Sequence, residues 1–251
     1  MLARLRFRVL LLIVLAPWWA LACSSQEAIP DDALRVLFVG NSYTYTYDIP
    51  DIVAQLAEAA GGRPLYHRSV VAPGISLEDH WQRGEAKRAI EDGAWDYVVM
   101  QQGPSSLASS QAHLREWTTQ FAETIRSAGG EPAVYMVWPE QARRSAFEAV
   151  VTSYTGAAEA ANALLLPVGA AWQVAWQQDA SLPLYGPDGL HPSQTGAYFA
   201  ALVMYAGLFQ QSPEGLPNAF QTPNGQRFTV PQARAALLKI TARNILVAAT
   251  H

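Results

Sequence analysis

Two short segments of the sequence carry residues that could act together in nucleophilic catalysis. Ser42 follows an apolar run, Val36–Val39, and a glycine, while Asp188 and His191 lie three residues apart in a stretch rich in glycine and proline. A serine hydroxyl is a poor nucleophile unless an imidazole removes its proton, and the imidazole needs a carboxylate to fix its tautomer. One local loop could deliver both Asp188 and His191, so the residues indicate a Ser-His-Asp triad.

The elements that must bring these segments together are predicted by the pattern of apolar residues. Val36–Val39 is typical of a buried parallel strand that ends just before Ser42. Further strands are expected at 65–71, 95–100, 132–138 and 164–168. Because helical spacing separates these runs, we expect one doubly wound parallel sheet covered on both faces. Ser42 would then lie at the edge where such sheets bind ligands.

The helices are predicted from their caps and their spacing. Ser76 and Ser193 are expected to cap helices, since each precedes a helical stretch. One long helix is expected at 142–163 and a last helix at 231–249. The segment 211–228 is rich in proline, glycine and asparagine, so we expect it to be irregular.

Together these segments resemble the SGNH (GDSL-like) hydrolases over residues 35–209. The family's nucleophile block matches Gly40–Thr44, with Asn41 where most members have Asp, and its Asp-x-x-His-Pro block matches Asp188–Pro192. The resemblance implies an α/β fold, a flavodoxin-like three-layer α/β/α sandwich with a five-stranded parallel sheet. It also implies a serine esterase with an acyl-enzyme intermediate, in which Ser42, His191 and Asp188 are catalytic.

The same resemblance suggests an oxyanion hole. The expected donors are the backbone N–H groups of Ser42 and Gly74. Most members add an Asn side chain after the third strand, but this chain has no Asn there, and we expect Gln102 to replace it, with Gln101 and Ser105 as alternates. Tyr43 and Gln101 are expected to contact the substrate.

The substrate class is open at this stage. O-deacetylation of a carbohydrate is favoured, by analogy with the family and because aromatic residues follow the nucleophile. A lysophospholipase or a general short-chain esterase is the nearest alternative. A further alternative is a non-catalytic glycan-binding protein of the cell envelope, motivated by Asn41 and by the missing Asn.

The composition argues against other classes of protein. The net charge of −4 offers no basic surface for nucleic acid. No nucleotide-binding glycine motif is present, so no cofactor is expected. His67, His80 and His113 lack metal-ligand spacing, so we expect no metal and interpret these histidines as structural.

The N-terminus is typical of a secretory signal. Three arginines precede a short apolar run that is broken at Pro17. We interpret residues 1–22 as a signal peptide, 23–33 as a tether and 34–251 as the hydrolase-like domain. Cys23 is the only cysteine and follows small residues, as in a bacterial lipobox. It is therefore expected to carry a lipid anchor that places the protein at the outer membrane of a bacterial cell envelope; a periplasmic or secreted protein is the alternative.

Overall fold

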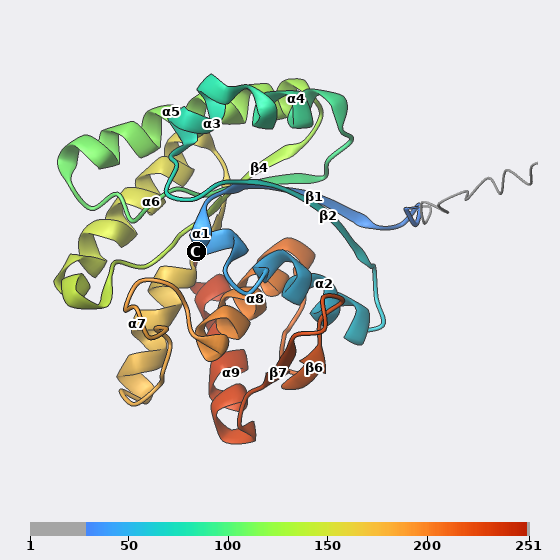
Figure 1. The fold of residues 1–251 in the computed structure, drawn as a ribbon, viewed down its shortest axis with the longest axis vertical. Helices are drawn as coiled ribbons and strands as arrows, with labels where there is room; N and C mark the ends of the chain where they lie inside the picture. Colours follow the sequence, from blue (N-terminus) through green and yellow to red (C-terminus); the bar gives the residue numbers. More distant parts are fainter. Residues whose placement is uncertain (1–28, 250–251) are drawn as a thin grey trace, which may run out of the picture.

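The central element is a five-stranded parallel sheet with strand order β2-β1-β3-β4-β5, seen in a computed structural model that describes residues 29–249 (Figure 1). The strands are β1 (Leu34–Gly40), β2 (Leu65–Val71), β3 (Tyr97–Met100), β4 (Glu131–Tyr135) and β5 (Leu164–Leu166). This order matches the flavodoxin-like arrangement, in which ligands bind where the order reverses, between β1 and β3. The predicted signal peptide, the lipidation site Cys23 and most of the tether lie outside the described residues.

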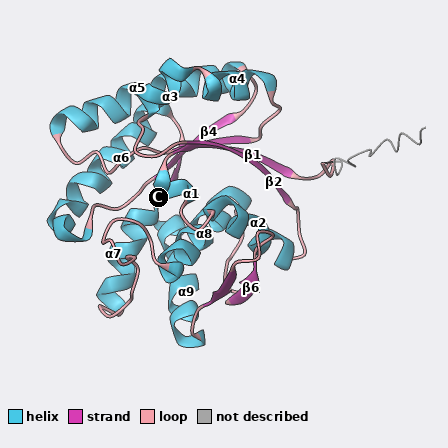
Figure 2. Cartoon of the chain, in the orientation of Figure 1, coloured by secondary structure: helices cyan, strands magenta, loops and turns pink. Residues whose placement is uncertain are grey.

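Helices cover both faces of the sheet (Figure 2). One face carries α3 (Leu77–Arg83), α4 (Glu85–Asp92), α5 (Ala108–Ser127) and α6 (Phe147–Ala161). The other face carries α2 (Ile49–Ala59), α7 (Val168–Gln178), α8 (Gln194–Phe209) and α9 (Gln232–Ala249). The predicted three-layer sandwich is therefore confirmed.

Burial explains why β1 and α8 form the centre of the molecule. The β1 side chains from Val36 to Val39 are buried, because strands flank β1 on both sides and helices cover both faces. Helix α8 is buried along its length from Gly196 to Leu208, because α2, α7 and α9 all pack against it. The Ser193 side chain accepts a hydrogen bond from the N–H of Gly196, which confirms Ser193 as the N-cap of α8.

Three local features differ from the sequence-based expectations. A short helix, α1 (Ser42–Tyr45), begins at the nucleophile candidate. The long helix expected at 142–163 is divided, because a 3₁₀ helix, η1 (Gln141–Ala146), precedes α6 and Arg143 has non-helical backbone angles. The segment expected to be irregular contains an antiparallel hairpin, β6 (Ala219–Gln221) and β7 (Arg227–Thr229).

The hairpin exists because its strands bury one aromatic pair. Phe220 and Phe228 face each other across the two strands and stack with ring centroids 5.1 Å apart. Gly225, with a φ of 86°, allows the turn between the strands. Each strand has only three residues, which is too short for an alternating pattern to stand out in the sequence. No helix within the described part of the chain is long and apolar enough to cross a membrane.

Candidate active site

Asp188 and His191 form a hydrogen-bonded pair in the loop before α8. Asp188 Oδ2 lies 2.6 Å from His191 Nδ1. The other carboxylate oxygen, Oδ1, accepts hydrogen bonds from the backbone N–H groups of Leu190 and His191, each at 3.0 Å. The Leu190 N–H, and then the His191 side chain, lower the pKa of Asp188 to about 2. Asp188 is therefore ionised at neutral pH and holds the His191 ring with Nδ1 as the donor.

The loop that carries this pair is fixed by backbone contacts. Gly189 has a φ of 67°, a left-handed conformation that favours glycine and permits the tight bend. Its carbonyl accepts a hydrogen bond from the Gln141 N–H at 2.7 Å, and the Trp138 indole donates to the Leu190 carbonyl at 3.0 Å. These bonds tie the loop to the segment after β4, so the pair is held in one place before any substrate binds.

The second nitrogen of His191 is the most informative atom of the site. Nε2 is buried and has no hydrogen-bond partner within the described residues. Buried polar atoms are nearly always paired, so an exception calls for an explanation such as a catalytic role. The ring of His191 lies beside the ring of Tyr43, with centroids 6.2 Å apart. Tyr43 directly follows Ser42 in residues 40–44, the nucleophile turn. The unpaired nitrogen therefore belongs to a ring that lies beside this turn.

The nucleophile turn is supported from β3 by the side chain of Gln101. Its carbonyl oxygen accepts from the Asn41 N–H and from the Thr44 hydroxyl, both at 2.9 Å. Its amide donates to Asn41 Oδ1 at 3.0 Å and to the Gln102 carbonyl at 2.6 Å. Gln101 is 1% exposed and all of its hydrogen-bonding capacity is used. These contacts give Gln101 a positioning role.

Asn41 connects this turn to the loop that carries Gly74. Its Oδ1 caps α1 by accepting from the Tyr43 N–H, and its Nδ2 donates to the Ile75 carbonyl at 3.0 Å. An ionised aspartate could not donate this second bond. The need to bind a carbonyl therefore explains why Asn fits a position that is Asp in most SGNH hydrolases. The predicted substrate contacts of Tyr43 and Gln101 stay predictions.

His80, in α3, supports the same turn through a hydrogen bond to its first residue. Its Nε2 donates to the Gly40 carbonyl at 2.8 Å, and the side chain is buried. Burial lowers the pKa of His80, which keeps the ring neutral. The interpretation of His80 as structural agrees with these contacts.

The backbone donors expected at the oxyanion hole are unpaired. No hydrogen bond within the described chain involves the N–H of Ser42 or of Gly74. Gly74 has a φ of 64° in an exposed loop, a conformation that favours glycine. Both groups are thus available to bind a developing negative charge, and their role as oxyanion donors stays a prediction.

Gln102 makes contacts that the sequence did not reveal. Its oxygen accepts from the Leu77 N–H at 3.2 Å, and its Nε2 donates to the Ser105 hydroxyl at 2.9 Å. The same Nε2 lies 3.5 Å from Nδ1 of His113, whose Nε2 is 2.9 Å from a carboxylate oxygen of Glu78. Gln102 must release one of these contacts to reach an oxyanion, and the 3.5 Å contact is the weaker.

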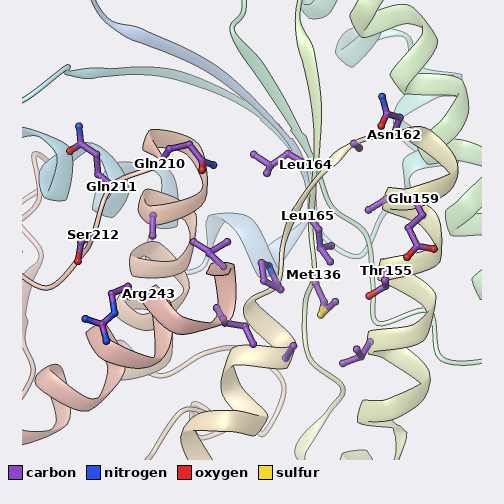
Figure 3. A pocket seen from close by; sticks show the side chains of 18 residues that line it. Met136, Thr155, Glu159, Asn162, Leu164, Leu165, Gln210, Gln211, Ser212 and Arg243 are labelled. Atoms are coloured by element: carbon purple, nitrogen blue, oxygen red, sulfur yellow. The ribbon is translucent and has the colours of Figure 1, made fainter. Parts of the chain in front are cut away.

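One space next to the Asp188–His191 pair is a groove of about 520 Å³. It is lined by the segment 45–48, by the loop residues 186–188 and 191–192, and by the hairpin residues Asn224 and Gln226. A second, larger cavity of about 770 Å³ lies at the edge strand β5 (Figure 3). Its floor is apolar and includes Leu164 and Leu165, and no histidine lines it. Asp188 and His191 therefore belong to the smaller groove, and Ser42 is not among its lining residues. Within the described residues, no cluster of His, Cys, Asp or Glu could hold a metal ion.

Comparisons with known proteins identify the fold. No protein-family model matches the sequence, and no curated protein matches it. A solved structure of a candidate SGNH hydrolase from Slackia heliotrinireducens is 27% identical, with a TM-score of 0.59 over 70% of this chain and 99% of that chain. A DUF4886 family protein from Bacteroides uniformis is 18% identical, with a TM-score of 0.68 over 88% of this chain and 97% of that chain. A lipase/acylhydrolase from Enterococcus faecalis is also 18% identical, with a TM-score of 0.55 over 73% of this chain and 97% of that chain.

The chain therefore has the SGNH hydrolase fold, as the strand order and the position of the Asp188–His191 loop also indicate. The expectation of a flavodoxin-like sandwich is confirmed, and the resemblance inferred from the sequence is confirmed at the level of the fold.

Proposed function

We propose that this protein is a serine ester hydrolase with Ser42 as nucleophile, His191 as general base and Asp188 as the residue that orients His191. The observation that carries the proposal is the buried, unpartnered Nε2 of a histidine whose Nδ1 is bonded to an ionised carboxylate, beside the turn that holds Ser42. The likeness of the fold to that of a lipase/acylhydrolase supports ester chemistry.

In the proposed reaction, Ser42 Oγ attacks the ester carbonyl carbon while His191 Nε2 accepts the hydroxyl proton. The carbonyl oxygen becomes an oxyanion, bound by the N–H groups of Ser42 and Gly74 and by the side-chain amide of Gln102. Loss of one such donor costs about 2.7–4 kcal/mol of transition-state stabilisation. The imidazolium then protonates the leaving alcohol as the C–O bond breaks, which leaves an acyl-enzyme on Ser42.

In deacylation, a water molecule is the nucleophile and the Ser42 oxygen is the leaving group. A water molecule attacks the acyl carbon while His191 Nε2 takes one of its protons. The second tetrahedral intermediate collapses, the Ser42 oxygen leaves with the proton from His191, and the carboxylic acid is released. Asp188 stays ionised throughout and stabilises the imidazolium in both halves of the reaction.

The proposed substrate is a carbohydrate that carries short O-acyl groups, in particular O-acetyl groups. The groove beside the Asp188–His191 pair is lined by both polar and apolar groups, whereas the mainly apolar cavity lies at β5 with no histidine in its lining. A lysophospholipase would need an apolar surface for a long acyl chain close to its nucleophile. A general short-chain esterase remains the nearest alternative.

The test uses the purified full-length chain and a series of 4-nitrophenyl esters from acetate to dodecanoate. We expect hydrolysis that is fastest for acetate and that is abolished in Ser42→Ala. A maximum at long chains would favour the lysophospholipase. A folded protein that hydrolyses none of the esters would favour the non-catalytic glycan-binding alternative.

We also propose that Cys23 carries a lipid that attaches the protein to a bacterial membrane, with the outer membrane as the expected site. The support is the sequence alone, since Cys23 is the only cysteine and follows a signal-like segment. Metabolic labelling with a fatty-acid analogue should mark the protein and should be lost in Cys23→Ser. Labelling that survives this substitution would contradict the proposal.

A further inference from the structure

The groove beside the Asp188–His191 pair has two walls that no catalytic step uses. One wall is the segment from Tyr45 to Asp48, which leads from the nucleophile turn into α2. The other wall is the end of the β6–β7 hairpin, with Asn224 and Gln226. Tyr47 packs against Phe228 of the hairpin, with ring centroids 5.9 Å apart, so the two walls are in contact. The groove is therefore built by two segments that hold each other in place.

The hairpin presents hydrogen-bonding groups that have no partner in the described chain. The side-chain amide of Gln226 makes no hydrogen bond there. Asn224 uses its Oδ1 to accept from the Thr222 hydroxyl at 2.7 Å and from the Gln226 N–H at 3.1 Å, which leaves its Nδ2 without a partner. Asn224 is thus fixed by one end of its amide and offers the other end as a donor.

The opposite wall adds an aromatic face. Tyr45 is 39% exposed, which makes it one of three large hydrophobic residues that are exposed in the described part of the chain. An exposed aromatic ring next to unpaired amides is suited to a ligand that has both hydroxyl groups and an apolar face. A sugar ring has both. A simple alkyl alcohol uses its single hydroxyl group in the ester bond and has none left to bind the amides.

The backbone of this wall is held in an uncommon conformation. Tyr47 and Asp48 have φ values of 63° and 51°, and neither is glycine. The left-handed region is unfavourable for such residues, and it persists where the surrounding structure enforces it, most often at functional sites. Two consecutive residues in this region show that the wall is shaped by its surroundings rather than by local preference.

The charges of the groove select against anionic ligands. Asp48 and Asp188 line it, and no lysine or arginine is among its lining residues. A phosphate-bearing alcohol would meet the Asp188 carboxylate without a cation to offset the repulsion. The neutral hydroxyl groups of a sugar meet no such penalty.

We propose that this groove is the subsite for the alcohol side of the ester and that it takes the ring of a neutral saccharide, with Asn224 and Gln226 donating to its oxygen atoms and Tyr45 packing on its face. The proposal rests on the esterase function proposed above and names the residues that would make it selective for sugar esters.

The test compares kcat/KM for 6-O-acetylglucose, which keeps its other hydroxyl groups free, with kcat/KM for 4-nitrophenyl acetate. Two variants remove the proposed donors: Gln226→Ala deletes the free amide, and Asn224→Asp keeps the Oδ1 contacts of the hairpin but replaces the free donor with an acceptor. We expect the ratio of sugar ester to nitrophenyl ester to fall about 3- to 10-fold in each variant and about 10- to 100-fold in the double variant, as expected for one and two lost hydrogen bonds.

Thr229→Ala is the matched control, because Thr229 is exposed in the same hairpin and lies outside the lining of the groove. Both rates and their ratio should stay within about twofold of the unmodified protein. An unchanged ratio in the double variant would overturn the subsite. So would an unmodified protein that hydrolyses 4-nitrophenyl acetate but not 6-O-acetylglucose, or that prefers lysophosphatidylcholine.

Failure of the esterase function itself would give a different result, since the unmodified protein would then hydrolyse neither ester. In that event, calorimetric titration with 6-O-acetylglucose still tests the subsite. Binding that is weakened about 10- to 100-fold in the double variant would support it. Absence of binding, or equal binding by the variant, would contradict it.

Discussion

Two histidine–carboxylate pairs lie near the same edge of the sheet and differ in what their second nitrogen meets. His191 bonds Asp188 through Nδ1 and has a buried, unpaired Nε2. His113 bonds Glu78 through Nε2, and its Nδ1 lies 3.5 Å from the Gln102 amide. The two side chains are similarly exposed, at 27% and 30%, so exposure does not distinguish them.

The difference teaches that the residue types alone do not define a catalytic base. A base needs a nitrogen that is oriented by a carboxylate on one side and free on the other. His191 meets this condition, whereas both nitrogens of His113 have protein partners. We infer that His113 positions Gln102 and does not take part in proton transfer.

Replacing each histidine should give the largest contrast. We expect His191→Ala to lower kcat for 4-nitrophenyl acetate by about 10⁴- to 10⁶-fold, because Ser42 loses its base. His113→Ala should lower kcat by less than about 100-fold, because at most the orientation of one oxyanion donor is lost. Steady-state kinetics on the two variants, with circular dichroism to establish folding, measures the contrast. Equal losses of kcat in the two variants would contradict the proposed difference between the histidines.

Replacing the carboxylate of each pair should give the same contrast, with a larger loss of kcat at Asp188 than at Glu78. Asp188→Asn is expected to lower kcat by about 10⁴-fold, because an amide cannot hold the productive tautomer of the histidine. Glu78→Gln should cost no more than about tenfold, because Gln102 keeps its bonds to Leu77 and Ser105. A large effect of Glu78→Gln would show that the second pair takes part in the chemistry.

Gln102 contacts His113 of the second pair and is the expected oxyanion donor for the first, so its replacement sharpens the comparison. We expect Gln102→Ala to lower kcat by about 10²- to 10³-fold with little change in KM, because the donor acts only on the oxyanion. A thermal melt must accompany the kinetics, because the substitution leaves the buried Leu77 N–H without its partner. An unchanged kcat would point to Gln101, to Ser105 or to no side-chain donor.

The smallest expected effect concerns stability and pH. The pKa of Asp188 is lowered from 3.8 to about 2 in the folded chain, so the bonds of its carboxylate stabilise the fold above pH 3.8. That contribution is lost as the pH falls through 2. The melting temperature of Asp188→Asn should therefore lie slightly below that of the unmodified protein at pH 5 and approach it near pH 2. A constant difference between the two proteins would contradict a preformed pair.

The sequence predicted the parts of the site that depend on local chemistry. Asp188, Gly189 and His191 lie within four residues, so their bend and their hydrogen bond follow from one loop. The strand before Ser42 followed from its apolar run. The contact between Ser42 and His191 was inferred from the family resemblance and stays a prediction.

Contacts between distant segments could not be predicted in this way. Glu78 and His113 are 35 residues apart on α3 and α5, and no periodic pattern indicates that these helices place them side by side. The donation from Asn41 to the Ile75 carbonyl likewise depends on how two loops pack. The hairpin wall of the groove was not predicted, because its strands are short and its segment has the composition of a loop.

The most direct test of the central claim is to map where a fluorophosphonate probe reacts with the full-length protein. The probe bonds covalently to serines that are activated by a base. Peptide mass spectrometry should find the adduct on Ser42, and labelling should be lost in both Ser42→Ala and His191→Ala. An adduct on Ser105, which lies on the Gln102–His113 side, or no adduct in a folded protein, would contradict the assignment of Ser42 and His191.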